Sequence, residues 1–103
     1  MLRVRLCRLD ELPAGELRAF HVPGVTWPVL AGVFDGELIA TAGVCPHDDV
    51  SLADGDLDGT CLTCPGHGYV FELRTGACRH DPSLLLRRYR TRVDGDDVWV
   101  DLV

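Results

Sequence analysis

Apolar and polar residues alternate with a period of two in six short segments of this chain. The segments are residues 3–7, 17–22, 29–34, 38–44, 86–93 and 98–102. Turn-forming dipeptides separate them, and Asp35-Gly36 and Asp94-Gly95 are the strongest hairpin signals. No stretch of eleven or more residues follows the helical period, and only single turns are expected at 10–12 and 82–85. The sequence therefore predicts an all-β fold.

Length and composition fit one small folded domain, expected over residues 1–103. Hydrophobic residues make up 47% and charged residues 25% of the 103 residues, which leaves room for one modest core. The net charge of −6 argues against nucleic acid and anionic membranes as partners. No apolar run approaches the roughly 20 residues that cross a bilayer, and the N-terminus lacks a signal-peptide pattern. We therefore expect a soluble cytoplasmic protein that is monomeric when free.

The negative charge is concentrated in one Gly- and Asp-rich segment, residues 45–82. This segment holds seven acids and two bases, whereas the remaining 65 residues hold nine acids and eight bases. Such a composition is typical of loops inserted into a strand scaffold. The same segment contains the residues best suited to bind a metal.

Two short boxes in this segment each combine a thiol with an imidazole. They are Cys45-Pro46-His47 and Cys64-Pro65-Gly66-His67-Gly68, with 16 residues between His47 and Cys64. Zinc fingers pair Cys with Cys and His with His, whereas mixed pairs suit a [2Fe-2S] centre that has two Cys on one iron and two His on the other. The boxes therefore favour an iron–sulfur cluster, with a zinc-stapled interaction module as the less favoured alternative.

The two boxes, followed by Phe71 and Thr75-Gly76, resemble the Rieske-type [2Fe-2S] ferredoxins over most of the chain. The resemblance implies one Rieske-type cluster per chain, with Cys45 and Cys64 on the inner iron and His47 and His67 on the outer iron near the surface. It also implies three small antiparallel sheets. In that arrangement a cluster-binding subdomain at about 42–80 is inserted into a base formed by both ends of the chain.

The chain departs from the Rieske proteins of respiratory and photosynthetic complexes at four positions. That branch has a disulfide between the two loops, and the matching positions here are Val50 and Gly66. It also has Ser and Tyr hydroxyl donors near the cluster, where this chain has Tyr69 and Phe71. Loss of a donor to sulfur destabilises the reduced state, and the acidic surroundings act in the same direction. We therefore expect a low reduction potential.

The resemblance implies a one-electron carrier that is not catalytic alone. Similar ferredoxins take electrons from an NAD(P)H-dependent flavoprotein reductase and pass them to a terminal oxygenase, either an aromatic-ring dioxygenase or a diiron hydrocarbon monooxygenase. The alternative is the small Rieske-like subunit of assimilatory nitrite reductase. Such a subunit would be a permanent part of an enzyme instead of a diffusing ferredoxin.

Residues outside the boxes have simpler interpretations. The Cys61-x-x-Cys64 match lacks the βαβ setting of a redox motif, so we expect Cys7, Cys61 and Cys78 to act as small hydrophobic strand residues. His21 and His80 are expected at the surface. In 87–92, Arg88, Arg90 and Arg92 should share one solvated strand face with Leu86.

Three acids near the first box leave two readings open. Asp48, Asp49 and Asp81 either form an acidic docking collar around the exposed histidines or only solvate their loops.

Overall fold

The fold consists of two antiparallel sheets. The structure is a computed structural model that describes residues 2–47, 49–66 and 68–102. The larger sheet has six strands in the order β1-β9-β8-β4-β3-β2, and the smaller has three in the order β5-β6-β7. The strands are β1 (Arg3–Arg8), β2 (Leu17–Phe20), β3 (Val29–Phe34), β4 (Glu37–Ala42), β5 (Asp56–Asp58), β6 (Cys61–Thr63), β7 (Val70–Glu72), β8 (Arg88–Asp94) and β9 (Asp97–Asp101).

All six predicted strands are present, with ends that differ by up to two residues. Both predicted hairpins are confirmed: Asp35 and Gly36 have φ of 52° and 78°, and Gly95 has φ of 61°. The expected turn at 10–12 is a 3-10 helix, η1 (Leu9–Glu11). Elsewhere in the described ranges no α-helix is found, and none there is long and apolar enough to span a bilayer.

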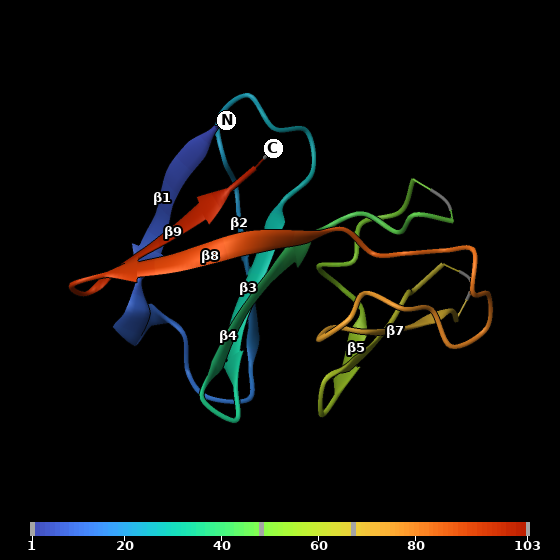
Figure 1. The fold of residues 1–103 in the computed structure, drawn as a ribbon. Helices are drawn as coiled ribbons and strands as arrows, with labels where there is room; N and C mark the ends of the chain where they lie inside the picture. Colours follow the sequence, from blue (N-terminus) through green and yellow to red (C-terminus); the bar gives the residue numbers. More distant parts are fainter. Residues whose placement is uncertain (1, 48, 67, 103) are drawn as a thin grey trace.

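Residues 45–82 are more ordered than the prediction of inserted loops. This segment lies outside the large sheet, as expected, but it contains β5, β6 and β7, whose residues pair with one another in a sheet of their own. In Figure 1 this small sheet and its loops lie at one end of the molecule, on the far side from β1.

The base consists of two three-stranded halves that are joined into one six-stranded sheet. Strand β4 pairs with β8 at Ala40–Tyr89 and Thr41–Arg88, and this short ladder joins β1-β9-β8 to β4-β3-β2. The joined sheet curls, so β1 and β9 lie across from β2 and β3 in Figure 1. Both ends of the chain contribute edge or near-edge strands to this base.

Strand β3 is covered on both faces, because two separate cores lie against it. Val29 and Ala31 point into a core inside the curled sheet, together with Val98 and Val100 of β9. Leu30 points to the opposite side, into a core shared with the small sheet. The second core consists of Leu30, Phe34, Ile39, Cys45, Leu52, Leu62, Cys64, Phe71, Leu73, Cys78 and Leu86. This second core fixes the small sheet to the base.

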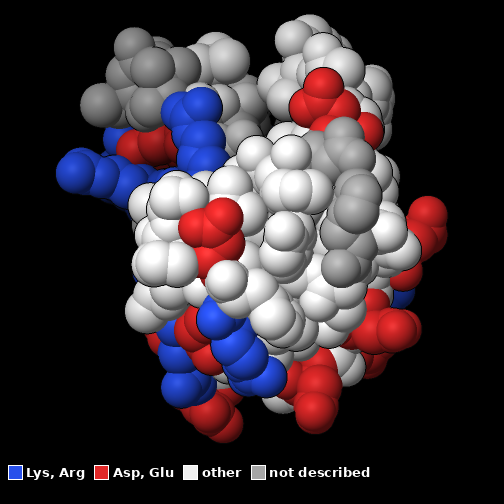
Figure 2. Space-filling view, turned by 90° about the vertical axis from the view of Figure 1, so that its right-hand side faces the viewer, with Lys and Arg blue, Asp and Glu red and all other residues white. Residues whose placement is uncertain are grey.

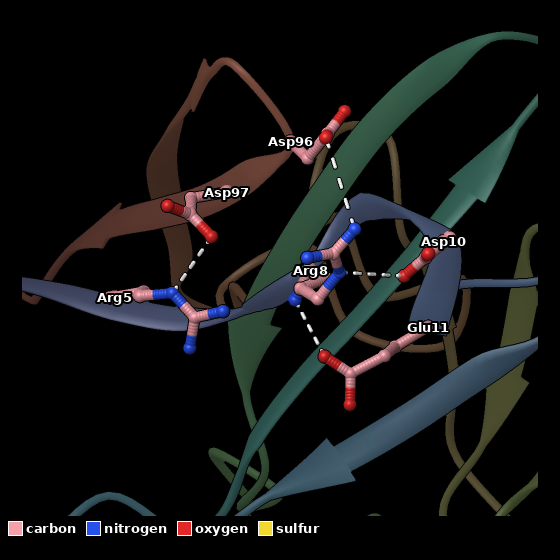
Figure 3. Close-up of polar contacts among 6 residues, drawn as sticks. All are labelled: Arg5, Arg8, Asp10, Glu11, Asp96 and Asp97. Atoms are coloured by element: carbon pink, nitrogen blue, oxygen red, sulfur yellow. Dashed lines mark hydrogen bonds and ion pairs between the residues drawn. The ribbon is translucent and has the colours of Figure 1, made fainter.

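Ion pairs cover the outer edge of the base. Arg5 Nε lies 2.9 Å from Asp97, and Arg8 Nε lies 3.4 Å from Asp10 (Figure 3). The Arg8 N–H also donates to a Glu11 carboxylate oxygen at 2.6 Å. Arginines at this edge therefore have acidic partners within the chain.

The basic run of β8 is solvated, as predicted, with one difference. Arg88, Arg90 and Arg92 are all exposed. Leu86, however, precedes the strand and is buried in the core beneath the small sheet. The prediction that Leu86 shares the exposed arginine face is therefore wrong, because the chain leaves the strand pattern before Arg88.

Gly76 brings the small sheet close to the chain that leads back to β8. Its φ is 82°, and a Cβ at this position would collide with the Leu86 carbonyl oxygen. The Leu86 N–H donates to the Gly76 carbonyl at 2.7 Å. Glycine is required here both for the positive φ and for the close approach of two backbones.

Candidate metal centre

The first Cys-His box lies on the first loop, residues 43–52, directly after β4. A backbone hydrogen bond from the Cys45 N–H to the Val50 carbonyl, 2.9 Å long, closes its base. Cys45 is 2% exposed, whereas His47 is exposed at the surface. The loop therefore buries its thiol and presents its imidazole.

The second box lies on the second loop, residues 64–69, between β6 and β7. The Cys64 N–H donates to the Tyr69 carbonyl at 2.8 Å, and the Gly68 N–H donates to the Cys64 carbonyl at 3.0 Å. Cys64 is 1% exposed and belongs to the same core as Cys45. His67 lies outside the described residues.

The two loops touch at the positions where a related branch has a disulfide. A Cβ built on Gly66 would lie 3.7 Å from the Cβ of Val50 and 3.2 Å from its Cγ2. Disulfide-linked residues have Cβ atoms about 3.5–4.5 Å apart. Val50 and Gly66 therefore lie close enough for a disulfide, but the chain has no covalent link at these positions.

A third segment, residues 77–86, completes the surroundings of the boxes. The ring of Tyr69 meets the ring of His47 edge-on, with centroids 4.4 Å apart, and the centroid of the His80 ring lies 5.9 Å from that of Tyr69. Nδ1 of His80 accepts a hydrogen bond from the Val70 N–H at 3.4 Å. His80 is at the surface, as predicted, but its contact with Tyr69 is not evident from the sequence.

A tight turn shapes the third segment. One carboxylate oxygen of Asp81 accepts hydrogen bonds from the Ser83 hydroxyl at 2.6 Å and from the Ser83 N–H at 2.9 Å. These two bonds hold the pKa of Asp81 below its usual range, with a smaller contribution from His47. The Leu84 N–H then donates to the Asp81 carbonyl at 3.1 Å, which confirms the predicted turn at 82–85. The Asp-Pro-Ser sequence is the signal for it.

The three acids considered as a docking collar do not have equivalent roles. Asp81 is engaged in the turn just described, Asp49 is exposed, and Asp48 lies outside the described residues. Figure 2 looks onto the end of the molecule that carries the small sheet, and most of the described surface there is uncharged. Acidic side chains lie mainly along the lower and right-hand edges of this view.

The three cysteines outside the boxes differ in how far they are buried. Cys7 and Cys78 are buried, as predicted, and burial, followed by the charge of Glu11, raises the pKa of Cys7 to about 11. Cys61 is only half-buried, so the prediction of a small hydrophobic strand residue is wrong for it. Its Sγ accepts a hydrogen bond from Arg79 Nη2 at 3.4 Å and lies 3.7 Å from Glu72 Oε2. Alternation along β6 turns Cys61 away from the core that holds Leu62.

The donor set suits a cluster that is protected on one side and accessible on the other. Cys45 and Cys64 are both free thiols in one dry core, and thiolates are the ligands that iron–sulfur clusters prefer. Among the described residues, which do not include His67, no three possible ligands converge on one point. The fit therefore rests on the pair of buried thiols and on the exposed His47.

Comparison with known proteins agrees with this chemistry. Residues 3–90 match the Rieske family, described as the Rieske [2Fe-2S] domain. The ferredoxin component of biphenyl 2,3-dioxygenase from Rhodococcus jostii (strain RHA1) is 33% identical over 103 residues, covering 99% of this chain and 94% of the relative.

Two solved structures are similar over nearly the whole chain. Sphingomonas yanoikuyae B1 ferredoxin has a TM-score of 0.84 at 29% identity, covering 99% of this chain and 100% of that one. A chain from the complex of reduced oxygenase and oxidized ferredoxin in carbazole 1,9a-dioxygenase has a TM-score of 0.82 at 26% identity, with 95% of this chain and 91% of that one covered.

The fold and the paired boxes define a small β protein with one Cys-His box on each of two neighbouring loops. The chain belongs to the Rieske [2Fe-2S] family, and the family carries a Rieske-type [2Fe-2S] cluster. Within that family it is a ferredoxin of the kind found as a component of bacterial oxygenase systems, which is an electron carrier.

Proposed function

We propose that this chain carries single electrons from an NAD(P)H-dependent flavoprotein reductase to a terminal oxygenase. The burial difference between the two donor types carries the proposal, because Cys45 and Cys64 lie in the core while His47 is exposed. The bound cluster would supply one-electron redox chemistry. The chain would supply a dry inner side and an exposed imidazole side through which electrons enter and leave.

The proposed ligands are Cys45 and Cys64 for the inner iron and His47 and His67 for the outer iron. The two thiols belong to one core, and both first residues of the boxes are held by backbone hydrogen bonds across their own loops. His67 matches the second histidine of the family pattern in sequence. The whole chain, residues 1–103, would act as one domain, with the cluster-binding subdomain at about 42–80.

Matched cysteine variants test this ligand set. Cys64→Ser should lose nearly all iron and acid-labile sulfide, because a hydroxyl is a poor substitute for a soft thiolate. Cys61→Ser, three residues away on the outer face of β6, should retain two irons and two sulfides per chain. Equal metal loss in both variants, or equal retention, would contradict the assignment.

The spectroscopic test uses the purified protein before and after reduction with dithionite. The expected result is a red-brown protein that gives, when reduced, a rhombic EPR signal with an average g below that of all-cysteine [2Fe-2S] ferredoxins. A colourless, anaerobically prepared protein with one zinc would overturn the proposal in favour of a structural clamp.

A low reduction potential is part of the proposal. Phe71, at the position of a tyrosine donor in the respiratory branch, is fully buried and has no hydroxyl to donate to the cluster or its ligand. Fewer donors leave the additional negative charge of the reduced cluster less stabilised. The midpoint should lie near the negative end of the range from about −150 to +300 mV. Protein-film voltammetry measures it, and a clearly positive midpoint would contradict this point.

The choice of oxygenase class is open between an aromatic-ring dioxygenase and a diiron monooxygenase, and the genes beside this one would distinguish them. A nitrite reductase small subunit is less favoured, because the 33% identical relative is the ferredoxin component of a dioxygenase. As a carrier, the chain should be monomeric when free and should lie in the cytoplasm, where NAD(P)H is available. Co-purification with a large sirohaem protein would favour the nitrite reductase subunit instead.

A further inference from the structure

An apolar groove lies directly beside the first loop. It has a volume of about 460 Å³. Its walls come from three distant parts of the chain, and the residues that matter here are Val25, Trp27, Val44, Pro46, Leu85 and Tyr89. The groove therefore exists only because the fold brings together the loop before β3, the first loop and residues 85–89.

Pro46 connects the groove to the proposed electron path. It lies between Cys45 and His47 in the chain and lines the groove. A protein surface that rests on the exposed His47 therefore also covers the rim of the groove. This adjacency distinguishes it from the hollows elsewhere on the described surface, such as the one near Trp99 on the outer face of the base.

Leu85 is held outward in this groove by its neighbours. The two neighbouring leucines are less exposed than Leu85, since Leu84 is half-buried and Leu86 is fully buried. The Leu86 N–H donates to the Gly76 carbonyl, which anchors the segment on one side. Leu85 itself is 64% exposed, the most among the large hydrophobic residues described. A single exposed leucine is ordinary, but Leu85 is continuous with the apolar lining of the groove, and contiguous exposed apolar surface marks interaction sites.

The groove is nearly without charge. Arg87 is the one ionised side chain among its described lining residues. Its guanidinium donates to the Leu102 carbonyl at 3.0 Å and lies 5.2 Å from the centre of the Tyr89 ring. In a chain of net charge −6, an apolar patch with this single charge fits a largely apolar partner surface.

We propose that this groove receives an apolar side chain of the terminal oxygenase when the two proteins dock for electron transfer. The proposal rests on the electron-carrier function proposed above. The oxygenase is the occupant because the carbazole dioxygenase structure is a complex of a ferredoxin with its oxygenase. Docking of this kind is dominated by water release from apolar surface, so it depends little on salt. This differs from the acidic collar that the sequence left open.

The test is anaerobic stopped-flow reoxidation of the dithionite-reduced protein by the oxygenase component purified from the cells that produce this chain. Leu85→Asn replaces the leucine with a neutral polar side chain of similar size, and it should lower the second-order rate constant about tenfold. Leu85→Ala should lower it several-fold. The matched control is Leu9→Asn, on η1 far from the cluster loops (Figure 1), where Leu9 is 37% exposed. It should leave the rate unchanged.

Two further readouts separate docking from damage. The midpoint potential and the EPR signal should be the same in all variants, because neither Leu85 nor Leu9 is a proposed ligand. The wild-type rate constant should change less than about threefold between low salt and 0.5 M NaCl.

Each outcome has one meaning. If the wild type fails to reduce the oxygenase, the proposed function fails. If the wild type reduces it and Leu85→Asn is as fast as Leu9→Asn, the groove inference is wrong. If Leu85→Asn slows only reduction by the reductase, the assignment to the oxygenase is wrong, and a rate that falls steeply with salt supports the acidic collar instead.

Discussion

At the scale of single residues, the role of Tyr69 depends on contacts that the sequence does not reveal. Its sequence position matches a serine donor of the respiratory branch, yet its ring is close to the rings of both His47 and His80. Edge-on aromatic pairs contribute about 0.5–1.5 kcal/mol beyond the area they bury. We therefore expect Tyr69 to restrict the orientation of the His47 imidazole.

Replacement of Tyr69 tests this positioning role. Tyr69→Ala should broaden the EPR signal of the reduced protein and shorten the half-life of its visible absorbance several-fold, because the His47 ring loses its neighbour. Tyr69→Phe keeps the ring and should restore both properties. An alanine variant with wild-type spectra would show that Tyr69 does not position His47, and a phenylalanine variant as impaired as alanine would assign the effect to the hydroxyl.

At the scale of elements, the two cluster loops are joined only by non-covalent contacts among the residues described. Each loop is closed by its own backbone hydrogen bonds, and the loops meet at Val50 and Gly66. The strands between the loops escaped prediction because they are three residues long. A period of two cannot be recognised over so few residues, and their ladders depend on pairing between segments, such as Leu62 with Phe71.

A double variant, Val50→Cys with Gly66→Cys, should form a disulfide without movement of the backbone. The expected Cβ–Cβ distance of 3.7 Å lies within the range of natural disulfides. Closing a loop of this length should stabilise the fold by about 3 kcal/mol in the chain-entropy model. The measurement is the free-thiol count together with the rate of cluster loss on heating, compared with each single variant. Two more free thiols in the aerobically purified double variant than in the wild type, which has five cysteines, would show that the loops lie further apart.

At the scale of the whole molecule, strands β1 and β9 bring the two ends of the chain together. Arg3 pairs with Asp101 across this ladder, with Nε 2.8 Å from the carboxylate. The hydrogen bond from Arg3, then its charge and those of Arg90 and Arg92, hold the pKa of Asp101 below its usual range. The stabilisation is therefore present above the unfolded-state pKa, near 4, and is lost as the pH falls through the lower folded-state pKa.

Asp101→Asn should lower the Tm by about 1–3 °C between pH 5 and 7. The difference from wild type should shrink as the pH falls below about 4, because the wild-type carboxylate then becomes protonated. Thermal unfolding across this pH range measures the effect. The control is Asp54→Asn, for which no hydrogen bond or ion pair with another described residue is seen. A constant difference between wild type and Asp101→Asn at every pH would contradict a charge-based role.

The sequence by itself determined the strand class and both hairpins, and it supplied the proposed donor residues of the boxes. Alternation and turn residues such as Asp35-Gly36 act between near neighbours in the chain, and ligand preference is a property of Cys and His themselves. Only the tertiary structure decided the β4–β8 junction, the exposure of Cys61, the contacts of Tyr69 and the groove around Leu85. Each of these features requires contact between segments that are tens of residues apart in the chain. Such contacts depend on the path of the loops between the segments, which local sequence patterns do not specify.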